Sequence, residues 1–341
     1  MAASISDVAR RANVSISTVS RVINRPKLVN VQTRERVQEA IQELGYHPNA
    51  FARGLMLRKS EMIGLVLPDM HGEFYSEIIR GANMKARELD YNLIISSAHD
   101  PDDTRGLLAG IRQRRLMDGV AVMVSEVTDH IEQELRDLRL PFVVLDSDID
   151  GTTHDSVVID QRAGALAMMR HLVNDCGAER IFFVGGLETN VDTIARLDAY
   201  RTVLKESNQP FRREDVYHLD YQYETAYAFA REHVQAWAGR GHCVFAANDE
   251  MASGIIDAAA AISLRVPEDI AVVGFDDTRV ARMTRPPLTT VRVPMAQMGA
   301  TAIELLCQRL ADPSLPTRHV SLPPELVTRK SCGVELRGTH A

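Results

Sequence analysis

Cysteine is scarce in this sequence, and the four cysteines lie far apart. Cys176, Cys243, Cys307 and Cys332 form no Cys-x-x-Cys pair, and no histidines cluster at zinc-binding spacing. The sequence therefore contains no metal-binding motif. Because cysteines outside disulfides are among the most buried residue types, we expect reduced, buried thiols and no bound metal.

Long apolar runs are missing too. No stretch approaches the roughly 18 consecutive apolar residues of a membrane span, and Met1–Asp7 lacks the basic and then apolar pattern of a signal peptide. With 45% hydrophobic and 25% charged residues, the composition is that of a globular protein. We expect a soluble, cytoplasmic protein with no membrane partner, and its 341 residues leave room for two or three packed units.

The short motifs of several enzyme classes are also absent. The sequence contains no G-x-x-x-x-G-K-[ST], G-x-G-x-x-G, H-E-x-x-H or G-x-S-x-G pattern. Gly185-Gly186 alone is more typical of a turn than of a phosphate site. The acids Asp276 and Asp277 could suggest hydrolysis, but neighbours in sequence rarely face each other across a substrate. We expect no enzyme and no cofactor.

Charge is distributed unevenly along the chain. Residues 1–60 contain ten basic and four acidic residues, a net charge of +6; the whole chain carries −7, so the remainder carries −13. A basic head on an acidic body is typical of proteins in which only the head approaches a polyanion, because neutralised phosphates release counterions. A solvated basic face would give the same balance, so the local pattern must decide.

The first 46 residues predict three short helices. Ser4 and Asp7 fit a capping box at the start of the first helix, Ser15 and Asn30 suit the N-caps of the next two, and Gly45 ends the third. The second helix, at about 16–23, carries hydroxyls and an arginine outside its apolar stripe, and such groups read base edges and phosphates. This favours a helix-turn-helix unit over a plain three-helix bundle.

Several segments of this head share a further pattern: Asp7–Ala9, Asn13–Asn24, Thr33–Val37 and Glu43–Ala50. Together they resemble the DNA-binding headpiece of the lactose-repressor (LacI/GalR) family. The resemblance implies that Ile16, Ser17 and Arg21 face base edges. Ile16 can meet only apolar features such as a thymine methyl, so the other two would carry most hydrogen-bonded readout. Phosphate contacts are implied for Ser15, Thr18, Ser20, Asn24 and Tyr46.

Residues 47–60 read as a linker when taken alone. In the family this segment is a hinge helix that folds on the operator, and the resemblance implies that Leu55 enters the minor groove with Ala52 beside it. An isolated helix of this length is marginal, and Gly54 weakens it further. A plain linker remains the alternative.

From Met62 onward, short apolar runs alternate with helical stretches, which predicts β-α-β units and parallel sheets. Two series of four buried strands are expected, at 63–67, 93–95, 119–124, 142–145, 180–184, 216–219, 243–246 and 270–275. They predict an α/β body, residues 61–341, with two doubly wound parallel-sheet lobes and ligands near the carboxyl ends of the strands. We place lobe 1 at about 61–160 plus 291–320 and lobe 2 at about 161–290 plus 321–335.

The resemblance continues through Ala247–Gly254, Gly274–Asp277 and Pro286–Val291 and covers nearly the whole chain. The family's body is similar to periplasmic sugar-binding proteins and binds an effector between its lobes. The implied effector contacts are Phe74, Tyr75, Ile78, Asp146, Asp192, Arg196, Tyr221, Asn248 and Asp276. Carboxylates accept from vicinal hydroxyls, arginine donates a planar fork and aromatic faces cover a ring. Ion pairs and helix caps are the structural alternative for the polar members.

The sequence as a whole predicts a ligand-controlled transcription regulator, with a repressor as the first reading. We expect a homodimer on a near-palindromic DNA operator, and a sugar or sugar derivative as the effector. Asn190 stands where a purine-binding member of the family has an arginine, which disfavours a purine. An activator or dual regulator, and a purine- or nucleoside-responsive repressor, remain open.

Overall fold

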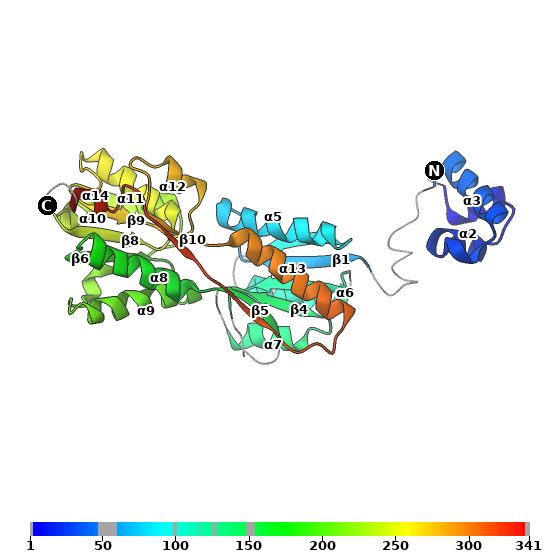
Figure 1. The fold of residues 1–341 in the computed structure, drawn as a ribbon. Coiled ribbons are helices and arrows are strands. Elements are labelled where there is room, and N and C mark those ends of the chain that lie inside the picture. Colours follow the sequence, from blue (N-terminus) through cyan, green and yellow to red (C-terminus); the bar gives the residue numbers. More distant parts are fainter. Residues whose placement is uncertain are drawn as a thin grey trace. The chain divides into compact units, whose positions relative to one another are not determined.

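The computed structural model describes residues 3–46, 60–97, 101–114, 116–124, 126, 128–147 and 154–337. Its contacts divide the chain into two units, Met1–Glu61 and Met62–Ala341, which we call the head and the body. Figure 1 follows the elements of each unit along the chain. No helix among the described residues is long and apolar enough to cross a membrane.

The head contains the three helices that the sequence predicts. They are α1 (Ile5–Arg11), α2 (Ile16–Asn24) and α3 (Val31–Leu44), with a 3-10 turn at Pro26–Leu28. One fully buried valine from each helix, Val8, Val19 and Val37, forms the centre of the core. The exposed surface of α2 is thus mostly polar, apart from Ile16.

Local capping sets the ends of these helices. The Ser4 hydroxyl accepts from the Asp7 backbone N–H, and the Asp7 carboxylate accepts from the Ser4 N–H at 3.0 Å, which completes the expected capping box. Asn13 turns the chain between α1 and α2 with φ of 52°. Gly45 ends α3 in the left-handed region, with φ of 58°. Sequence reasoning works here because each signal acts within four residues.

Lobe 1 of the body is built on a six-stranded parallel sheet in the order β11-β5-β4-β3-β1-β2. The strands are β1 (Met62–Leu67), β2 (Asn92–Ser97), β3 (Gly119–Met123), β4 (Phe142–Leu145), β5 (Asp155–Ile159) and β11 (His319–Leu322). Two of them, β5 and β11, are absent from the predicted set. Both mix polar with apolar residues, so neither reads as a continuous apolar run.

Helices cover both faces of this sheet. On one face, α5 (Gly72–Glu88) and α13 (Met295–Ala311) pack with the side chains of Leu65 and Val143. On the other, α6 (Pro101–Arg114) and α7 (Asp129–Asp137) pack with Val66 and Val144. Consecutive strand residues thus serve opposite cores, as expected for a sheet buried on both sides.

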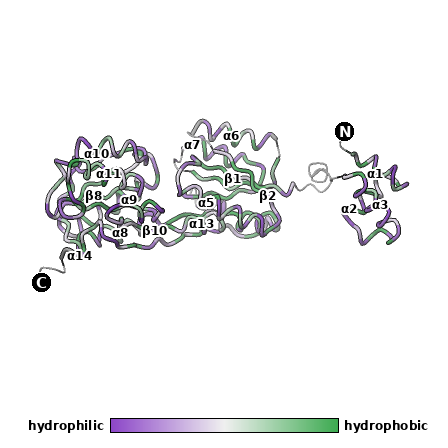
Figure 2. The backbone as a smooth tube through the Cα atoms, turned by 90° about the horizontal axis from the view of Figure 1, so that it is seen from above, coloured by the Kyte–Doolittle hydropathy of each residue, from purple (hydrophilic) through white to green (hydrophobic). Residues whose placement is uncertain are grey.

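Lobe 2 repeats the scheme with a four-stranded parallel sheet in the order β7-β6-β8-β9. Its strands are β6 (Arg180–Gly185), β7 (Val216–His218), β8 (His242–Ala246) and β9 (Ala271–Val273). Its helices are α8 (Gln161–Arg170), α9 (Val191–Glu206), α10 (Tyr223–Trp237), α11 (Asp249–Ala261), α12 (Arg279–Met283) and α14 (Val334–Arg337), with short turns at His171–Asp175 and Arg213–Asp215. In Figure 2 the strands around β1 and β8 are largely hydrophobic.

The chain passes between the lobes three times. After β5 it enters α8, after β10 (Thr290–Arg292) it enters α13, and after β11 it enters β12 (Glu325–Val327). β10 and β12 pair antiparallel, so two of the crossings lie side by side (Figure 1). Pairing of β11 with β5 keeps Ser321 and Leu322 in lobe 1, so the last crossing begins slightly later than the sequence-based boundary at residue 320.

Candidate effector site and DNA-binding surface

A cavity of about 530 Å³ lies between the two lobes of the body. Residues that directly follow β1, β3 and β4 in lobe 1 and β7, β8 and β9 in lobe 2 line it. The carboxyl ends of parallel strands are where ligands bind in open α/β sheets. The volume lies within the range of roughly 300–1,000 Å³ that is usual for small-molecule sites.

The structure brings eight of the nine expected effector contacts to this cavity. They are Phe74, Tyr75, Asp146, Asp192, Arg196, Tyr221, Asn248 and Asp276. Ile78 is the exception: it is fully buried in the hydrophobic core and does not line the cavity. It lies one helical turn beyond Phe74 and Tyr75 on α5, farther from the helix N-terminus that faces the cavity. We therefore withdraw Ile78 as a ligand contact.

Arg196 is a buried cation in the cavity wall, only 2% exposed. Its Nη1 donates to the Ala247 carbonyl at 2.5 Å, and its Nη2 donates to Gln161 Oε1 at 2.8 Å and to Asp192 Oδ2 at 3.2 Å. Its guanidinium lies over the Phe275 ring, 4.1 Å from the centroid. These contacts from several segments fix the guanidinium before any ligand arrives.

Three carboxylates share the cavity with this arginine: Asp146, Asp192 and Asp276. Burial raises the pKa of each above its ordinary value, and Arg196 opposes the rise. For Asp146 and Asp276, the neighbouring carboxylates raise the pKa further. Asp146 Oδ1 is buried and has no hydrogen-bond partner among the described residues. Such an acceptor costs about 1–3 kcal/mol, so a ligand hydroxyl that donates to it would be stabilising.

Three cavity residues are among the nine described non-glycine residues with positive φ. Asp146, Tyr221 and Asp276 have positive φ values of 63°, 68° and 111°. Residues other than glycine rarely adopt this region, and such outliers persist where the surroundings fix them, often at binding sites. All three of these strained residues line the cavity.

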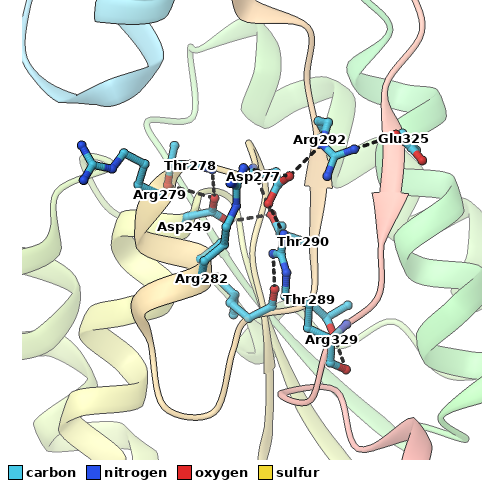
Figure 3. Close-up of polar contacts among 12 residues, drawn as sticks. Asp249, Asp277, Thr278, Arg279, Arg282, Thr289, Thr290, Arg292, Glu325 and Arg329 are labelled. Carbon is cyan, nitrogen blue, oxygen red and sulfur yellow. Dashed lines mark hydrogen bonds and ion pairs between the residues drawn. The ribbon is translucent and has the colours of Figure 1, made fainter.

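The strained turn at Asp276 is held by a buried network (Figure 3). Asp249, the first residue of α11, is fully buried and accepts from the Thr278 N–H at 2.7 Å and from the Thr290 hydroxyl at 2.6 Å. Burial raises the pKa of Asp249 to about 7, against the hydrogen bonds from Thr290 and Thr278 that lower it. Asp249 thus joins α11 to both sides of the turn.

Asp277 anchors the same turn to the crossing strands. Its fully buried carboxylate accepts from Arg292 Nε at 2.7 Å and from Arg329 Nη2 at 2.5 Å. Arg292 on β10 also pairs with Glu325 on β12 at 3.1 Å. Figure 3 shows this chain of contacts from the turn to both crossing strands. Asp277 therefore connects the position of Asp276 to the segments that join the lobes.

Tyr221 forms a second fixed corner of the cavity. Its hydroxyl lies 2.6 Å from Thr193 Oγ1 and donates to Asn190 Oδ1 at 2.9 Å, while Asn248 Nδ2 donates to its carbonyl at 2.9 Å. Asn248 and Asn190 also cap α11 and α9. The caps that sequence reasoning kept as the alternative for Asn248 are thus present, and the residue lines the cavity as well.

Gly186 leaves room for the Tyr221 ring. A Cβ at this glycine would lie 1.9 Å from Tyr221 Cε2. We expect Gly186→Ala to displace the ring, to weaken effector binding by about tenfold or more and to cost about 1–3 kcal/mol of stability. Isothermal titration of the variant with its effector measures the loss. Gly106→Ala is the matched control because nothing lies within 4 Å of its Cβ; equal affinity in both variants would contradict the prediction.

Two polar contacts join the lobes beside the cavity. Glu73 on α5 accepts from the Arg279 backbone N–H at 2.7 Å, and Thr189 donates to Glu126 at 2.9 Å. Both glutamates line the cavity. A ligand that changes the spacing of the lobes must therefore also change these contacts.

Sequence reasoning missed several other lining residues. Asp220, Gln222 and Tyr223 follow β7, and Glu126 follows β3. A polar side chain shortly after a strand is a signal that could have found them, because ligands bind at the carboxyl ends of parallel strands.

The expected DNA contacts gather on and beside α2. Ser15, Ser17 and Arg21 are exposed, and Ile16 keeps 49% of its surface exposed. Ser15 Oγ lies 2.7 Å from Ser17 Oγ and 2.9 Å from Thr18 Oγ1, while Asn24 Nδ2 donates to Ser20 Oγ at 3.3 Å. Thr18, Ser20, Asn24 and Tyr46 are half-buried. Ala52 and Leu55 lie outside the described residues.

Comparison with known proteins identifies both units. Residues 4–49 match the family model for bacterial regulatory proteins of the lacI family, and residues 169–332 match that for a periplasmic binding protein-like domain. Catabolite control protein A of Priestia megaterium is 36% identical over 333 residues, which cover 97% of this chain and 99% of that protein. The HTH-type transcriptional repressor PurR of Klebsiella pneumoniae is 34% identical over 96% of each chain.

Solved structures agree with these sequence matches. A lac repressor dimer bound to operator and the anti-inducer ONPF has a TM-score of 0.86 at 26% identity, covering 97% of this chain and 99% of that one. A complex of the transcriptional regulator CelR with cellobiose has a TM-score of 0.72 at 29% identity, covering 96% and 99%. The helix-turn-helix head, the two-lobed body and these full-length relatives show that the chain belongs to the lacI family of bacterial transcription regulators.

Proposed function

We propose that this regulator binds a near-palindromic operator as a homodimer in the cytoplasm and responds to a small hydroxylated effector, a sugar or sugar derivative. The observation that carries the choice of effector is the set of buried carboxylates, Asp146, Asp192 and Asp276, around one arginine in the cavity. Acceptors there outnumber donors, which suits a ligand rich in hydroxyl groups. We propose no catalytic activity, in line with its relatives, which are transcription regulators.

The aromatic side chains of the cavity support the same ligand class. Phe74 and Tyr75 meet edge to face with centroids 5.3 Å apart, and both line the cavity together with Tyr221. Aromatic faces pack well against the apolar faces of a sugar ring, while the carboxylates take its hydroxyls. The CelR structure contains cellobiose, a ligand of this chemistry.

A purine or nucleoside corepressor is the second candidate. It is favoured by the 34% identity to the repressor PurR. Against it, the Asn190 carbonyl oxygen already accepts from the backbone N–H groups of Asp192 and Thr193 and from the Tyr221 hydroxyl. This residue is therefore committed to the fold rather than to a base.

We propose that the effector acts by linkage between the lobes and the operator. A ligand that prefers one arrangement of the lobes shifts the dimer toward the state that can, or cannot, bind DNA. Ser17 and Arg21 would read base edges, and Leu55, from the hinge segment, would open the central base step. We propose repression as the regulatory effect. An activator would make the same DNA contacts at an operator in a different position relative to the promoter.

Thermal unfolding of the purified protein across sugars, sugar acids, polyols, nucleosides and purines tests the effector class. A ligand at 100 times its dissociation constant adds about 2.7 kcal/mol of stability. We expect a stabilising hit among the hydroxylated compounds. A hit confined to purines would favour the second candidate, and operator binding with and without the hit gives the sign of regulation.

Arg21→Ala tests the DNA-binding surface. We expect it to weaken operator binding by about 1–3 kcal/mol, or roughly 5- to 150-fold, because a base contact is lost. Discrimination between operator and unrelated DNA should fall with it. Arg36→Ala, an exposed arginine on α3, is the control and should change binding to both DNAs alike. Fluorescence anisotropy at fixed salt measures the affinity of each variant for operator and for unrelated DNA. If Arg21→Ala leaves the ratio of these two affinities unchanged, Arg21 does not read bases.

A further inference from the structure

His171 and Cys176, five positions apart in the sequence, meet the distant Cys332 at one point in lobe 2. His171 Nε2 lies 3.4 Å from Cys176 Sγ and 3.5 Å from Cys332 Sγ, and the three atoms all lie within 4.8 Å of one another. Cys176 and Cys332, which lie far apart in the sequence, are therefore neighbours in space. His171 and Cys332 are buried and Cys176 is half-buried.

An irregular helical turn creates this meeting. His171–Asp175 forms a π-helical turn at the end of α8, closed by a hydrogen bond from the Cys176 N–H to the His171 carbonyl at 3.0 Å. In a regular α-helix each residue turns the side-chain direction by about 100°. Side chains five positions apart, such as those of His171 and Cys176, would therefore point about 140° apart. The wider turn brings residues five apart to the same face. Such turns are rare and often occur at functional sites.

Asp175 orients the histidine. Its carboxylate lies 2.8 Å from His171 Nδ1, and an Nδ1–H that donates to it leaves the Nε2 lone pair facing the two thiols. A carboxylate behind a histidine in this way is the usual outer partner of a metal-binding imidazole. Asp175 itself is 60% exposed and has no role in the core.

The third residue is held by a rigid segment. Ser331, next to Cys332, is fully buried; its carbonyl accepts from the Val272 N–H and its hydroxyl accepts from the Thr289 N–H at 2.9 Å. Cys332 is therefore fixed against lobe 2 independently of His171. The π-helical turn positions His171 and Cys176, and the hydrogen bonds of Ser331 position Cys332. The three ligand atoms are therefore close together before an ion binds.

We propose that His171, Cys176 and Cys332 form a binding site for one thiophilic d¹⁰ cation, Zn²⁺ or Cu(I). Bonds of about 2.0 Å to nitrogen and 2.3 Å to sulfur at a tetrahedral centre place the nitrogen and sulfur atoms about 3.5 Å apart. The observed separations of 3.4 and 3.5 Å match this closely. Two thiolates neutralise Zn²⁺, so the zinc-loaded site carries no net charge in a partly buried place, whereas the site with Cu(I) carries one negative charge. Thiolates select both ions.

The ion would join two parts of the body. Cys176 follows the first helix of lobe 2, and Cys332 follows β12, the strand of the last crossing. Three protein ligands leave one coordination position open, on the side where Cys176 is half-exposed. The site is thus able to exchange its ion, and its occupancy would stabilise the anchoring of the last crossing on lobe 2.

The test uses the full-length protein, reduced and stripped of metal with a chelator. Zn²⁺ is titrated against a chromophoric chelator, and Cu(I) against a Cu(I)-specific one, to obtain stoichiometry and affinity. We expect one ion per chain, and thiolate-to-cobalt charge-transfer bands when Co²⁺ replaces Zn²⁺. Cys176→Ser and Cys332→Ser should each remove these bands, while Cys307→Ser, a cysteine outside the cluster, should keep them.

Asp175→Asn gives a milder second variant on an exposed residue. We expect it to lower metal affinity by about 10- to 100-fold, because the histidine loses its orienting partner, with little change in effector or operator binding. The proposal is overturned if the reduced wild-type protein binds neither ion more tightly than the Cys176→Ser, Cys332→Ser double variant. It is also overturned if the two thiols form a disulfide under mild oxidation while the reduced protein binds no ion.

Discussion

We expect Asp277→Ala to lower the free energy of unfolding of the body by about 3–5 kcal/mol, the usual cost of removing one partner from a buried ion pair. The Asp277 carboxylate is fully buried between Arg292 and Arg329, and Arg282 lies 3.9 Å away. Its removal leaves the Arg329 guanidinium, 16% exposed, without its ion-pair partner. The crossing strands β10 and β12 then lose their shared anchor on the turn.

Urea unfolding measured by the fluorescence of Trp237 provides the readout. This residue is the sole tryptophan and is 2% exposed in the lobe-2 core, so its emission reports the unfolding of lobe 2. Asp198→Ala is the matched control, since Asp198 pairs with Arg162 at the surface; exposed pairs contribute at most about 1 kcal/mol. If Asp277→Ala lowers the free energy of unfolding no more than Asp198→Ala does, the ion pairs of Asp277 do not hold the turn.

Replacing Arg196 by methionine should abolish the effector response. The guanidinium is the buried cation among Asp146, Asp192 and Asp276, and methionine keeps much of its bulk over the Phe275 ring. Charge-assisted hydrogen bonds contribute about 1.5–3 kcal/mol each, so affinity for the effector should fall by about 100-fold or more. The uncompensated carboxylates also repel one another, which raises their pKa values further and favours the neutral carboxyl form, a weaker acceptor.

Calorimetric titration with the compound found by thermal unfolding measures this loss. Arg162→Met on α8 is the control, since its guanidinium pairs with Asp198 at the surface, away from the cavity. Arg196→Lys separates the effect of the positive charge on effector affinity from that of the guanidinium shape, because lysine keeps the charge but lacks the planar fork of donors. Basal operator binding should persist in all three variants. An undiminished affinity in Arg196→Met would place the effector in a different pocket.

The sequence indicates different roles for Arg196 and Asp277. Arg196 was expected at the effector site from a family resemblance, and the structure supplies its partners, Gln161 and the Ala247 carbonyl, which no sequence spacing indicates. Asp277 was considered only as one of a pair of adjacent acids. The structure shows that Asp276 lines the cavity while Asp277 binds arginines of the crossing strands, so adjacent carboxylates have separate roles.

The sequence by itself determined whatever depends on short-range signals. The helices of the head follow from the capping box at Ser4, the N-caps and Gly45, each of which acts within one turn. Apolar runs of strand length predicted most strands of both lobes, because a strand buried on both faces must be apolar throughout. The family resemblance implied Asp146, Asn248 and Asp276 as effector contacts, and all three line the cavity.

Only the tertiary structure decided what depends on contacts between distant segments. Strands β5 and β11 are held by their neighbours in the sheet rather than by an apolar sequence, and Ile78 is buried by the packing of α5 against α13. The Asp277 network and the cluster of His171, Cys176 and Cys332 join residues more than fifty positions apart. No local pattern records such meetings, because they follow from how the sheets and crossing strands are assembled.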